Sequence, residues 1–348
     1  MELVNRCDSL YSHYLFIQVT HLHRVSFEGH PQWNTTGVTI AGTTSISGGA
    51  MTLLAQPHGI FIDPLTDLLY IADRFNHRIQ QYQFLTNGTT LINTVAGTSQ
   101  VSGCTLSLLY EPTAVSVDKQ QNLYIADLRN HRILYWPQGA TSGVTIVGSQ
   151  SCVYGSTLNL LGYPINILID STGTNLYISD WNNNRVIKRI GLNSSFGIVV
   201  AGGNGGGNSE IQTFNPWGLY LNESSNTMFI INNGGNTIQK WHLGDQNGTF
   251  LVGTPGISGS NASQFYNPSQ IIADSFGNLY VSDTSNHRIQ MFHKSNSYGT
   301  GITIAGVTGS AGSTGQRLHS PNGLAFDSNM NLFVADALNN RVQKFTLF

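Results

Sequence analysis

Charged side chains are scarce in this chain. Asp, Glu, Lys and Arg together account for 10% of the 348 residues, whereas a typical soluble domain has about 25%. Apolar residues account for 40%, which is enough to form a core, and 38 glycines indicate many turns. Because disordered chains have more charge and fewer aromatic residues, the composition argues against disorder. It favours a turn-rich all-β fold with a polar surface of Asn, Ser, Thr and Gly.

Basic clusters and long hydrophobic runs are also missing. The 16 Lys and Arg residues are scattered and the net charge is −2, whereas nucleic-acid-binding domains normally present a clustered basic face. We therefore expect no nucleic-acid partner. No stretch is long enough to span a bilayer, and the apolar residues 14–19 are too few and too interrupted for a signal peptide. A cytoplasmic location and a place within a larger extracellular protein both stay open.

The chain has only three cysteines, Cys7, Cys104 and Cys152. Zinc modules of the ring type need about eight Cys and His ligands at close spacing. We therefore expect no such module, no other metal site and no cofactor. Cys104 and Cys152 fall in equivalent loops of neighbouring repeats. A disulfide and a pair of ordinary thiols are both compatible with the sequence.

What the chain does have is a segment that recurs six times. The copies read LLYIADRFNHRI at residues 68–79, NLYIADLRNHRI at 122–133, NLYISDWNNNRV at 175–186, TMFIINNGGNTI at 227–238, NLYVSDTSNHRI at 278–289 and NLFVADALNNRV at 331–342. Each copy follows an apolar run that begins with proline. The six prolines are Pro57, Pro112, Pro164, Pro216, Pro268 and Pro321, 52 to 55 residues apart. A fixed period of this length is typical of a protein built from repeated structural units.

Each unit contains four short strands in a fixed order. The proline-led run and the Leu-Tyr-Ile/Val run form a hairpin. A half-exposed strand follows the Asn-His-Arg turn, and a short apolar run that ends in small residues comes last. We expect the first two strands to be buried and the last two to face solvent. Four strands per unit without helical periodicity predict one blade of a β-propeller.

The strand count predicts how the ring closes. The first copy of the fourth strand, residues 37–42, precedes the first complete unit, and the last unit ends without its own fourth strand. We predict an all-β, six-bladed propeller of four-stranded antiparallel blades over residues 29–348. An N-terminal strand closes the last blade, which removes two open sheet edges. Residues 1–28 are expected to be a degenerate partial repeat or a frayed N-terminal segment.

Within the recurring segment, an Asp lies five residues before an Arg. A carboxylate in that turn can accept hydrogen bonds from backbone amides and pair with the guanidinium. We interpret the pairs as structural contacts within a blade rather than a ring of charges for a ligand, because Asn232 and Thr237 replace both partners together in the fourth unit. The pairs are Asp73 with Arg78, Asp127 with Arg132, Asp180 with Arg185, Asp283 with Arg288, and Asp336 with Arg341.

Three of these arginines follow a histidine, namely His77, His131 and His287. Asn occupies the same position in the other three units. A metal ion would need several histidines at one place, whereas these lie in separate blades. We therefore expect a hydrogen-bonding role in the turn.

Positions that differ between the units are better candidates for function. One or two residues after each proline, the side chains are expected to surround one mouth of the central channel. The candidate ligand-binding residues there are His58, Thr113, Asn166, Trp217, Gln270 and Asn322. Gly/Ser-rich loops between the units, such as residues 99–111 and 149–163, form the face around this mouth. Loops on a rigid scaffold often carry binding residues.

Asn-His-Arg-Ile/Val after Leu-Tyr-Ile/Val-Ala/Ser-Asp resembles the NHL repeat family, and the resemblance covers residues 37–348. It implies a six-bladed propeller. It also implies a non-enzymatic binding or scaffold module that recognises a protein, a peptide or another ligand through its loop face. We expect this module to be monomeric.

The same resemblance leaves two alternatives open. Tripartite-motif ubiquitin ligases contain a similar ring as substrate or RNA receptor, although their zinc-binding parts and basic RNA-binding face are missing here. The chain would then be the substrate receptor of a ubiquitin-ligase system. The peptide-amidating lyase has an NHL-like ring with a zinc ion bound by His, and gluconolactonase-like enzymes have a similar ring. The chain would then be a metal-dependent lyase or hydrolase, although no matching ligand set is apparent at the channel.

Overall fold

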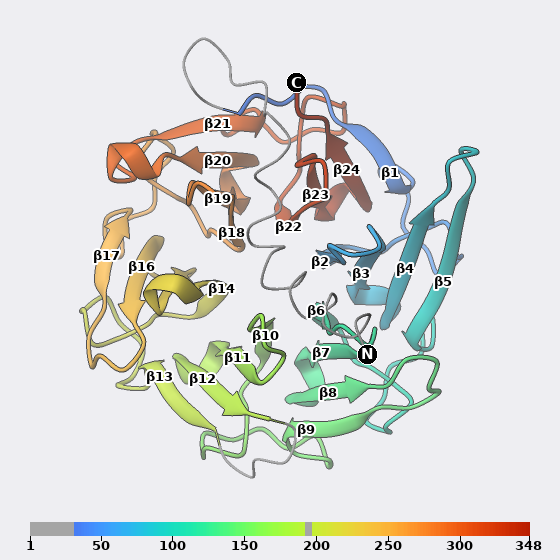
Figure 1. Cartoon of the computed structure of the whole chain (residues 1–348), viewed down its shortest axis with the longest axis horizontal. Helices are drawn as coiled ribbons and strands as arrows, with labels where there is room; N and C mark the ends of the chain where they lie inside the picture. Colours follow the sequence, from blue (N-terminus) through green and yellow to red (C-terminus); the bar gives the residue numbers. More distant parts are fainter. Residues whose placement is uncertain (1–30, 192–196) are drawn as a thin grey trace, which may run out of the picture.

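Six sheets surround a central axis in the computed structural model (Figure 1), which describes residues 31–191 and 197–348. Each sheet has four strands, and its neighbouring strands are antiparallel. The arrangement confirms the predicted six-bladed propeller. Residues 1–28, for which a degenerate repeat was predicted, lie outside the described residues. Within the part of the chain that the structure describes, no helix has the length and hydrophobicity needed to cross a bilayer.

The first three blades each consist of four consecutive strands. Blade 1 contains β2 (Pro57–Ile62), β3 (Leu69–Asp73), β4 (Arg78–Phe84) and β5 (Thr90–Gly97). Blade 2 contains β6 (Pro112–Val117), β7 (Leu123–Asp127), β8 (Arg132–Trp136) and β9 (Val144–Gly148). Blade 3 contains β10 (Pro164–Ile169), β11 (Asn175–Asp180), β12 (Arg185–Ile190) and β13 (Ile198–Gly202).

The last three blades include the one that is built from both ends of the chain. Blade 4 contains β14 (Pro216–Asn222), β15 (Thr227–Asn232), β16 (Thr237–His242) and β17 (Thr249–Val252). Blade 5 contains β18 (Ile271–Ala273), β19 (Leu279–Asp283), β20 (Arg288–Phe292) and β21 (Gly301–Gly306). Blade 6 contains β22 (Pro321–Phe326), β23 (Leu332–Asp336), β24 (Arg341–Phe345) and β1 (Val38–Gly42).

Single turns of 3-10 helix connect the second and third strands in five blades. They are η2 (Arg74–Asn76), η3 (Leu128–Asn130), η4 (Trp181–Asn183), η6 (Thr284–Asn286) and η8 (Ala337–Asn339). Two further turns are η5 (Glu223–Ser225), after β14, and η7 (Lys294–Asn296), after β20.

Burial follows the position of a strand within its blade. All five residues of β3, β7, β19 and β23 are buried, because both faces of a blade pack against neighbouring blades. The expectation that third strands face solvent is wrong, since β8 and β24 have one partly exposed residue each and β20 has none. The fourth strand covers the edge of the third, so third strands are exposed mainly near their ends, as at Phe84, Ile190 and His242. Fourth strands such as β1 and β9 are at least partly exposed along most of their length.

The N-terminal strand closes the ring as the sequence predicts. β1 pairs with β24, with Val38 opposite Lys344 and Gly42 opposite Arg341. Trp33, just before this strand, is buried and donates from its indole Nε1 to the carbonyl of Met330 at 2.9 Å. Both ends of the described chain therefore hold blade 6 together.

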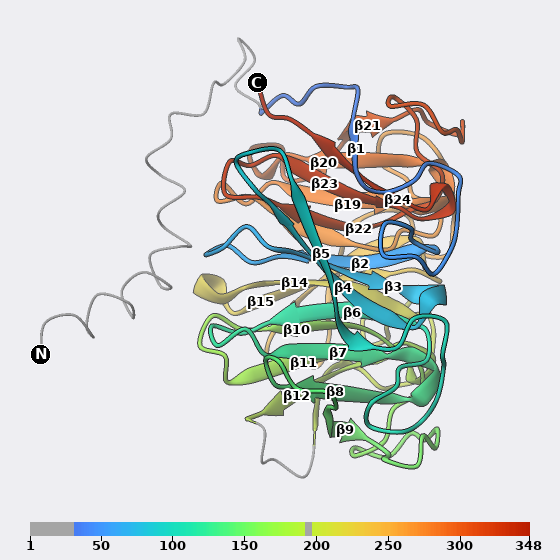
Figure 2. The same ribbon diagram turned by 90° about the vertical axis from the view of Figure 1, so that its right-hand side faces the viewer.

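The ring has two distinct faces, which lie on opposite sides in Figure 2. The connections from fourth strands to the next first strands form one face, which we call the loop face. The hairpin turns between first and second strands form the other, which we call the turn face. On the loop face, Cys104 and Cys152 form a disulfide with their Cα atoms 6.1 Å apart. Of the two states that the sequence left open, the structure has the disulfide.

A His or Asn at the end of each turn on the loop face joins neighbouring blades. This residue has a left-handed backbone, with φ of 52° at His131, which Asn tolerates better than most residues. Its Nδ1 or Oδ1 atom accepts a hydrogen bond from the backbone N–H just before the next blade's proline. The acceptor and donor residues are His77 and Glu111, His131 and Tyr163, Asn184 and Asn215, Asn236 and Asn267, His287 and Ser320, and Asn340 and Gln56. Burial lowers the pKa of the three histidines, which favours the neutral ring that accepts this bond.

Candidate functional site

The Asp and Arg of the repeat motif form buried ion pairs inside the blades. In blade 2, Asp127 Oδ2 accepts from Arg132 Nε at 2.8 Å and from Asn130 Nδ2 at 2.8 Å. Its Oδ1 accepts from the backbone N–H of Tyr110 at 2.7 Å. Burial raises the pKa of Asp127 to about 6, although Arg132 and the other donors act against this increase. Equivalent ion pairs join Asp73 to Arg78, Asp180 to Arg185, Asp283 to Arg288, and Asp336 to Arg341.

These arginines also hold the loop face in place. The Nη atoms of Arg132 donate to the backbone carbonyls of Cys104, Thr105 and Leu108, at 2.8 to 3.1 Å. The repeat motif therefore fixes the loop that leads into its own blade. The donors and acceptors of the motif in blade 2 have partners within the protein, as expected for a motif that holds the blade together.

Blade 4 replaces this charged network by a neutral one. Asn232 accepts from the backbone N–H of Phe214 at 3.2 Å and donates to Gln239 Oε1 at 3.0 Å. Its amide lies 3.5 Å from the Thr237 hydroxyl. The backbone N–H of Phe214 therefore still has a side-chain acceptor, and the replacement of both charged residues leaves neither one buried without its partner.

The six candidate ligand-binding residues lie together at the loop-face mouth of the channel, and four of them contact each other across it. The His58 and Trp217 rings, from opposite blades 1 and 4, are stacked with centroids 5.5 Å apart and planes inclined by 16°. Asn166 of blade 3 donates from Nδ2 to Gln270 Oε1 of blade 5 at 2.9 Å. We call these four residues the mouth cluster, and their side chains occupy the channel at this level.

Thr113 and Asn322 lie beside the mouth cluster and contact their neighbours mainly through the backbone. The Thr113 carbonyl is 3.0 Å from His58 Nδ1. The Asn322 carbonyl accepts from the Ser282 hydroxyl at 2.6 Å. His58 is 4% exposed, and burial lowers its pKa to about 3, with the Arg74 guanidinium acting in the same direction. The ring of His58 is therefore neutral at physiological pH.

Glycines let the inner strands approach closely at this mouth. A Cβ atom on Gly59 would lie 2.5 Å from the carbonyl oxygen of Thr113 in the next blade. A Cβ atom on Gly323 would lie 2.5 Å from the carbonyl oxygen of His58. The absence of these side chains makes the channel narrow at the loop face.

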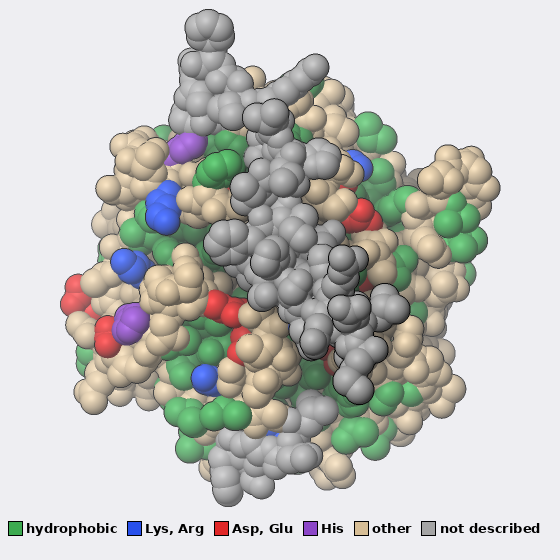
Figure 3. Space-filling model, in the orientation of Figure 1, with side chains coloured by type: hydrophobic (Ala, Val, Ile, Leu, Met, Phe, Trp, Pro, Cys, Tyr) green, Lys and Arg blue, Asp and Glu red, His purple; other side chains and the backbone are tan. Residues whose placement is uncertain are grey.

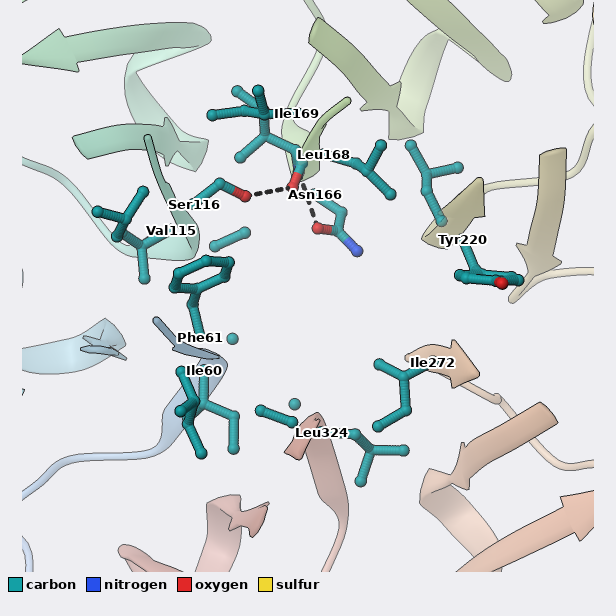
Figure 4. Close-up of a pocket in the computed structure, with 18 of the residues that line it drawn as sticks. Ile60, Phe61, Val115, Ser116, Asn166, Leu168, Ile169, Tyr220, Ile272 and Leu324 are labelled. Atoms are coloured by element: carbon teal, nitrogen blue, oxygen red, sulfur yellow. Dashed lines mark hydrogen bonds between the residues drawn. The ribbon is translucent and has the colours of Figure 1, made fainter. Parts of the chain in front are cut away.

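Beyond the mouth cluster, the channel widens into a chamber of about 980 Å³. Its wall consists mainly of apolar side chains from all six first strands. Figure 4 shows Phe61, Leu168 and Ile272 around the cavity, each from a different blade. The polar Ser116 donates its hydroxyl proton to the carbonyl of Ile167 at 3.0 Å. The volume is at the upper end of the roughly 300–1,000 Å³ usual for small-molecule sites.

The sequence analysis missed the side chains at the middle of this chamber. They occupy the fourth position after each proline and are Phe61, Ser116, Leu168, Tyr220, Ile272 and Ala325. The sequence contains one signal that could have identified them, namely the variation of this position between the units. The third position after the proline is apolar and branched in every unit, whereas the fourth ranges from Ala to Tyr. Alternation alone did not indicate that the fourth position faces a cavity.

The chamber ends at the turn face, where its rim is polar. Exposed residues at the rim include Lys119, Gln120, Thr172, Ser328 and Asn329. Acidic side chains gather near the centre of this face in Figure 3. The carboxylates that line the chamber are Asp118, Asp170, Glu223 and Asp327. Across residues 31–191 and 197–348, no group of three or more His, Cys, Asp or Glu side chains is placed to hold a metal ion.

Comparisons with known proteins give distant relatives. The chain is 24% identical over 314 residues to Protein SUPPRESSOR OF QUENCHING 1, chloroplastic, of Arabidopsis thaliana, which covers 84% of this chain and 25% of that protein. It is 37% identical over 83 residues to NHL repeat-containing protein 2 of Bos taurus, which covers 23% of this chain and 11% of that protein. The chain thus spans at most a quarter of the length of either relative. No family model matches.

Solved structures share the fold at low identity. An auxiliary nutrient binding protein from Bacteroides thetaiotaomicron has a TM-score of 0.65 at 14% identity, over 91% of this chain and 77% of that one. A gluconolactonase from Xanthomonas campestris has a TM-score of 0.60 at 12% identity, over 92% and 98%. Similarity at this level shows the architecture alone. The chain is an NHL-repeat-like six-bladed β-propeller with distant homology to NHL repeat-containing protein 2 and to SUPPRESSOR OF QUENCHING 1.

Proposed function

We propose that this chain is a non-enzymatic binding module that recognises a protein partner through its loop face, over blades 1 to 3. One observation carries the proposal, an exposed group of aromatic side chains with an arginine. We call it the aromatic patch, and it consists of Phe75, Tyr110, Arg129, Tyr154 and Tyr163. Aromatic residues and Arg are enriched among the residues that dominate binding energy at protein interfaces.

The patch combines exposure with internal contacts. Phe75 is 41% exposed, Tyr110 39% and Tyr154 46%. The Arg129 side chain is 44% exposed, and its guanidinium lies 5.5 Å from the ring centre of Tyr163. The Tyr154 and Tyr163 rings are 6.4 Å apart. Arg129, Tyr154 and Tyr163 therefore offer a partner a joined surface, and Phe75 and Tyr110 are exposed on the same loop face.

Two further contacts fix the patch before any partner binds. Glu111 accepts from Arg74 at 2.7 Å and from Arg129 at 3.3 Å, which joins blades 1 and 2. The disulfide between Cys104 and Cys152 joins the loop that carries Tyr110 to the loop that carries Tyr154. Side chains held in place lose less conformational entropy on binding, which favours affinity.

The proposal can be tested with a photo-crosslinking amino acid at position 154 in the full chain, expressed in its source cells. We expect a discrete protein adduct that Tyr110→Ala with Arg129→Ala abolishes. Leu65→Ala serves as the control, because Leu65 is similarly exposed at 45% but lies in a hairpin turn of the turn face. An adduct that persists in the double variant and disappears in the control would contradict the loop-face assignment.

Mass spectrometry of the adduct separates this module from the substrate receptor of a ubiquitin-ligase system. A receptor of that kind requires ligase components in the same complex. The nutrient binding protein and the gluconolactonase share the fold with this chain, and the fold alone does not decide between binding and catalysis.

A further inference from the structure

The chamber inside the ring has one narrow and one polar end. At the loop face, the mouth cluster occupies the channel through the stacked rings of His58 and Trp217. At the turn face, rim residues such as Gln120 and Thr172 are exposed. A molecule in the chamber would therefore contact apolar side chains along most of its length and polar groups at the turn face.

The middle of the wall has no charge at physiological pH. Among the described lining residues, the ionisable side chains apart from the rim are His58 and Tyr220. Burial lowers the pKa of His58 to about 3 and raises the pKa of Tyr220 to about 12, so both are neutral. Burying a charged group of a ligand at this depth would be costly. The body of a suitable ligand must therefore be apolar.

The rim has an excess of negative charge. Four carboxylates line it, those of Asp118, Asp170, Glu223 and Asp327, against the Lys119 ammonium and the Lys344 ammonium, which pairs with Asp327 at 3.0 Å. Hydrogen bonds favour the ionised form of the Asp170 carboxylate. Asp170 accepts hydrogen bonds from Thr172, Thr174 and Asn175. Burial alone would raise the pKa of Asp170, but these hydrogen bonds have the larger effect and lower it. The backbone N–H of Ser171 donates to Glu223 at 2.6 Å.

We propose that the chamber binds a small molecule with an apolar body and a positively charged head group. The body lies among Phe61, Leu168, Ile272 and their neighbours, and the head group lies at the rim beside Glu223 and Asp170. Apolar contact supplies most of the affinity, and the rim carboxylates select against anions. This site is separate from the aromatic patch of the loop face, so either proposal can fail without the other.

The first arm of the test measures occupancy of the chamber in the full chain. The neutral fluorophore N-phenyl-1-naphthylamine should bind saturably with one molecule per chain. Leu168→Trp and Ile272→Trp, which fill the chamber, should each weaken this binding about tenfold or more. Ile198→Trp adds the same volume on the exposed strand β13 and should leave it unchanged. Circular dichroism of every variant identifies any that fails to fold.

The second arm measures the charge preference by displacing the fluorophore with three ten-carbon compounds. We expect decyltrimethylammonium to displace it best, decanol next and decanoate worst, with about a tenfold difference between cation and anion at low salt. Glu223→Gln should reduce this difference and leave the decanol value unchanged. Equal binding by the filled variants would overturn the site, and a preference for decanoate would overturn the cationic head group.

Discussion

His77 Nδ1 accepts a hydrogen bond of 3.2 Å from the backbone N–H of Glu111, the residue that precedes the first strand of the next blade. The Oδ1 atom of Asn184 accepts the equivalent bond at 2.9 Å, which explains why either His or Asn occurs at this position in every blade. We expect His77→Asn to change the free energy of unfolding by less than about 0.5 kcal/mol, and His77→Ala to lower it by about 1–2 kcal/mol. Urea denaturation measures both values. Equal losses in the two variants would show that the ring acts through packing and not as an acceptor.

Removing one partner of a motif ion pair should cost more than removing both. Arg132→Thr leaves Asp127 as a buried charge without its partner and should destabilise the protein by about 3–5 kcal/mol. The double variant Asp127→Asn with Arg132→Thr reproduces the pair found in blade 4 and should recover about 1–2 kcal/mol of that loss. Denaturant titration of the two single variants and the double variant gives the coupling energy. If the losses of stability in the two single variants simply add up in the double variant, the Asp127 carboxylate and the Arg132 guanidinium do not stabilise each other.

The stability of the protein should fall in mild acid, partly because of His58. Its pKa is about 3 when folded and 6.5 ordinarily, so the unfolded chain binds a proton first as the pH falls. Its contribution is fully present above pH 6.5 and is lost as the pH falls towards 3. His58→Phe keeps the stack on Trp217 without the titration. From pH 7 to pH 4, the wild type should therefore lose roughly 3 kcal/mol more than this variant.

Buried carboxylates with a raised pKa stabilise the folded state as the pH falls, which is opposite to the effect of His58. The comparison with His58→Phe cancels their effect. The pKa of Asp127 is raised by burial, so its contribution favours the folded state at low pH and is lost as the pH rises through about 6. Asp127 is present in both proteins, and the difference between their two pH profiles isolates His58. Parallel profiles would indicate that the pKa of His58 is the same in the folded and the unfolded protein.

The N-terminal strand should be required for a stable ring. Trp33→Ala removes a buried indole that contacts Tyr280 and Phe326, with ring centres 5.4 and 6.0 Å away, and should cost about 3–5 kcal/mol. Deletion of residues 1–42 should cost at least as much, whereas deletion of residues 1–28 should cost little. Thermal unfolding of the three proteins tests this order. Equal effects of the two deletions would contradict closure by β1.

The disulfide between Cys104 and Cys152 closes a loop with a sequence separation of 48 residues. Its replacement by two serines should lower the free energy of unfolding by roughly 2–4 kcal/mol. A reducing agent should destabilise the wild type similarly and leave the double-serine variant unchanged. The variant should also bind a loop-face partner more weakly, because the disulfide positions Tyr110 and Tyr154. A reducing agent that affects both proteins alike would point to a different target.

Much of the fold could be predicted because the repeat constrains it at several levels. The prolines set the period, and the fourth-strand count placed residues 37–42 in the last blade, where β1 lies. The joint replacement at Asn232 and Thr237 indicated that the Asp and Arg contact each other, as they do. Strand-level burial was harder to predict, because a third strand such as β20 alternates in sequence while both of its faces are covered.

The site was harder to predict because it depends on side chains from opposite blades. Trp217 and His58 are far apart in sequence, and only the ring geometry brings them into a stack. The period placed the six candidate residues at one mouth, but it contained no information on their contacts with each other. The chamber residues, such as Phe61 and Tyr220, fell at an unremarked position of the repeat for the same reason.

The mouth cluster has a consequence for how molecules move through this ring. A six-bladed ring with an unobstructed axis would connect its two surfaces, and a small solute could cross from one to the other. Here the stacked rings of His58 and Trp217 and the bond between Asn166 and Gln270 interrupt that path. Entry to the chamber and exit from it must then use the same side. The rate of exchange of any molecule held there depends on the turn face alone and is independent of what occupies the loops.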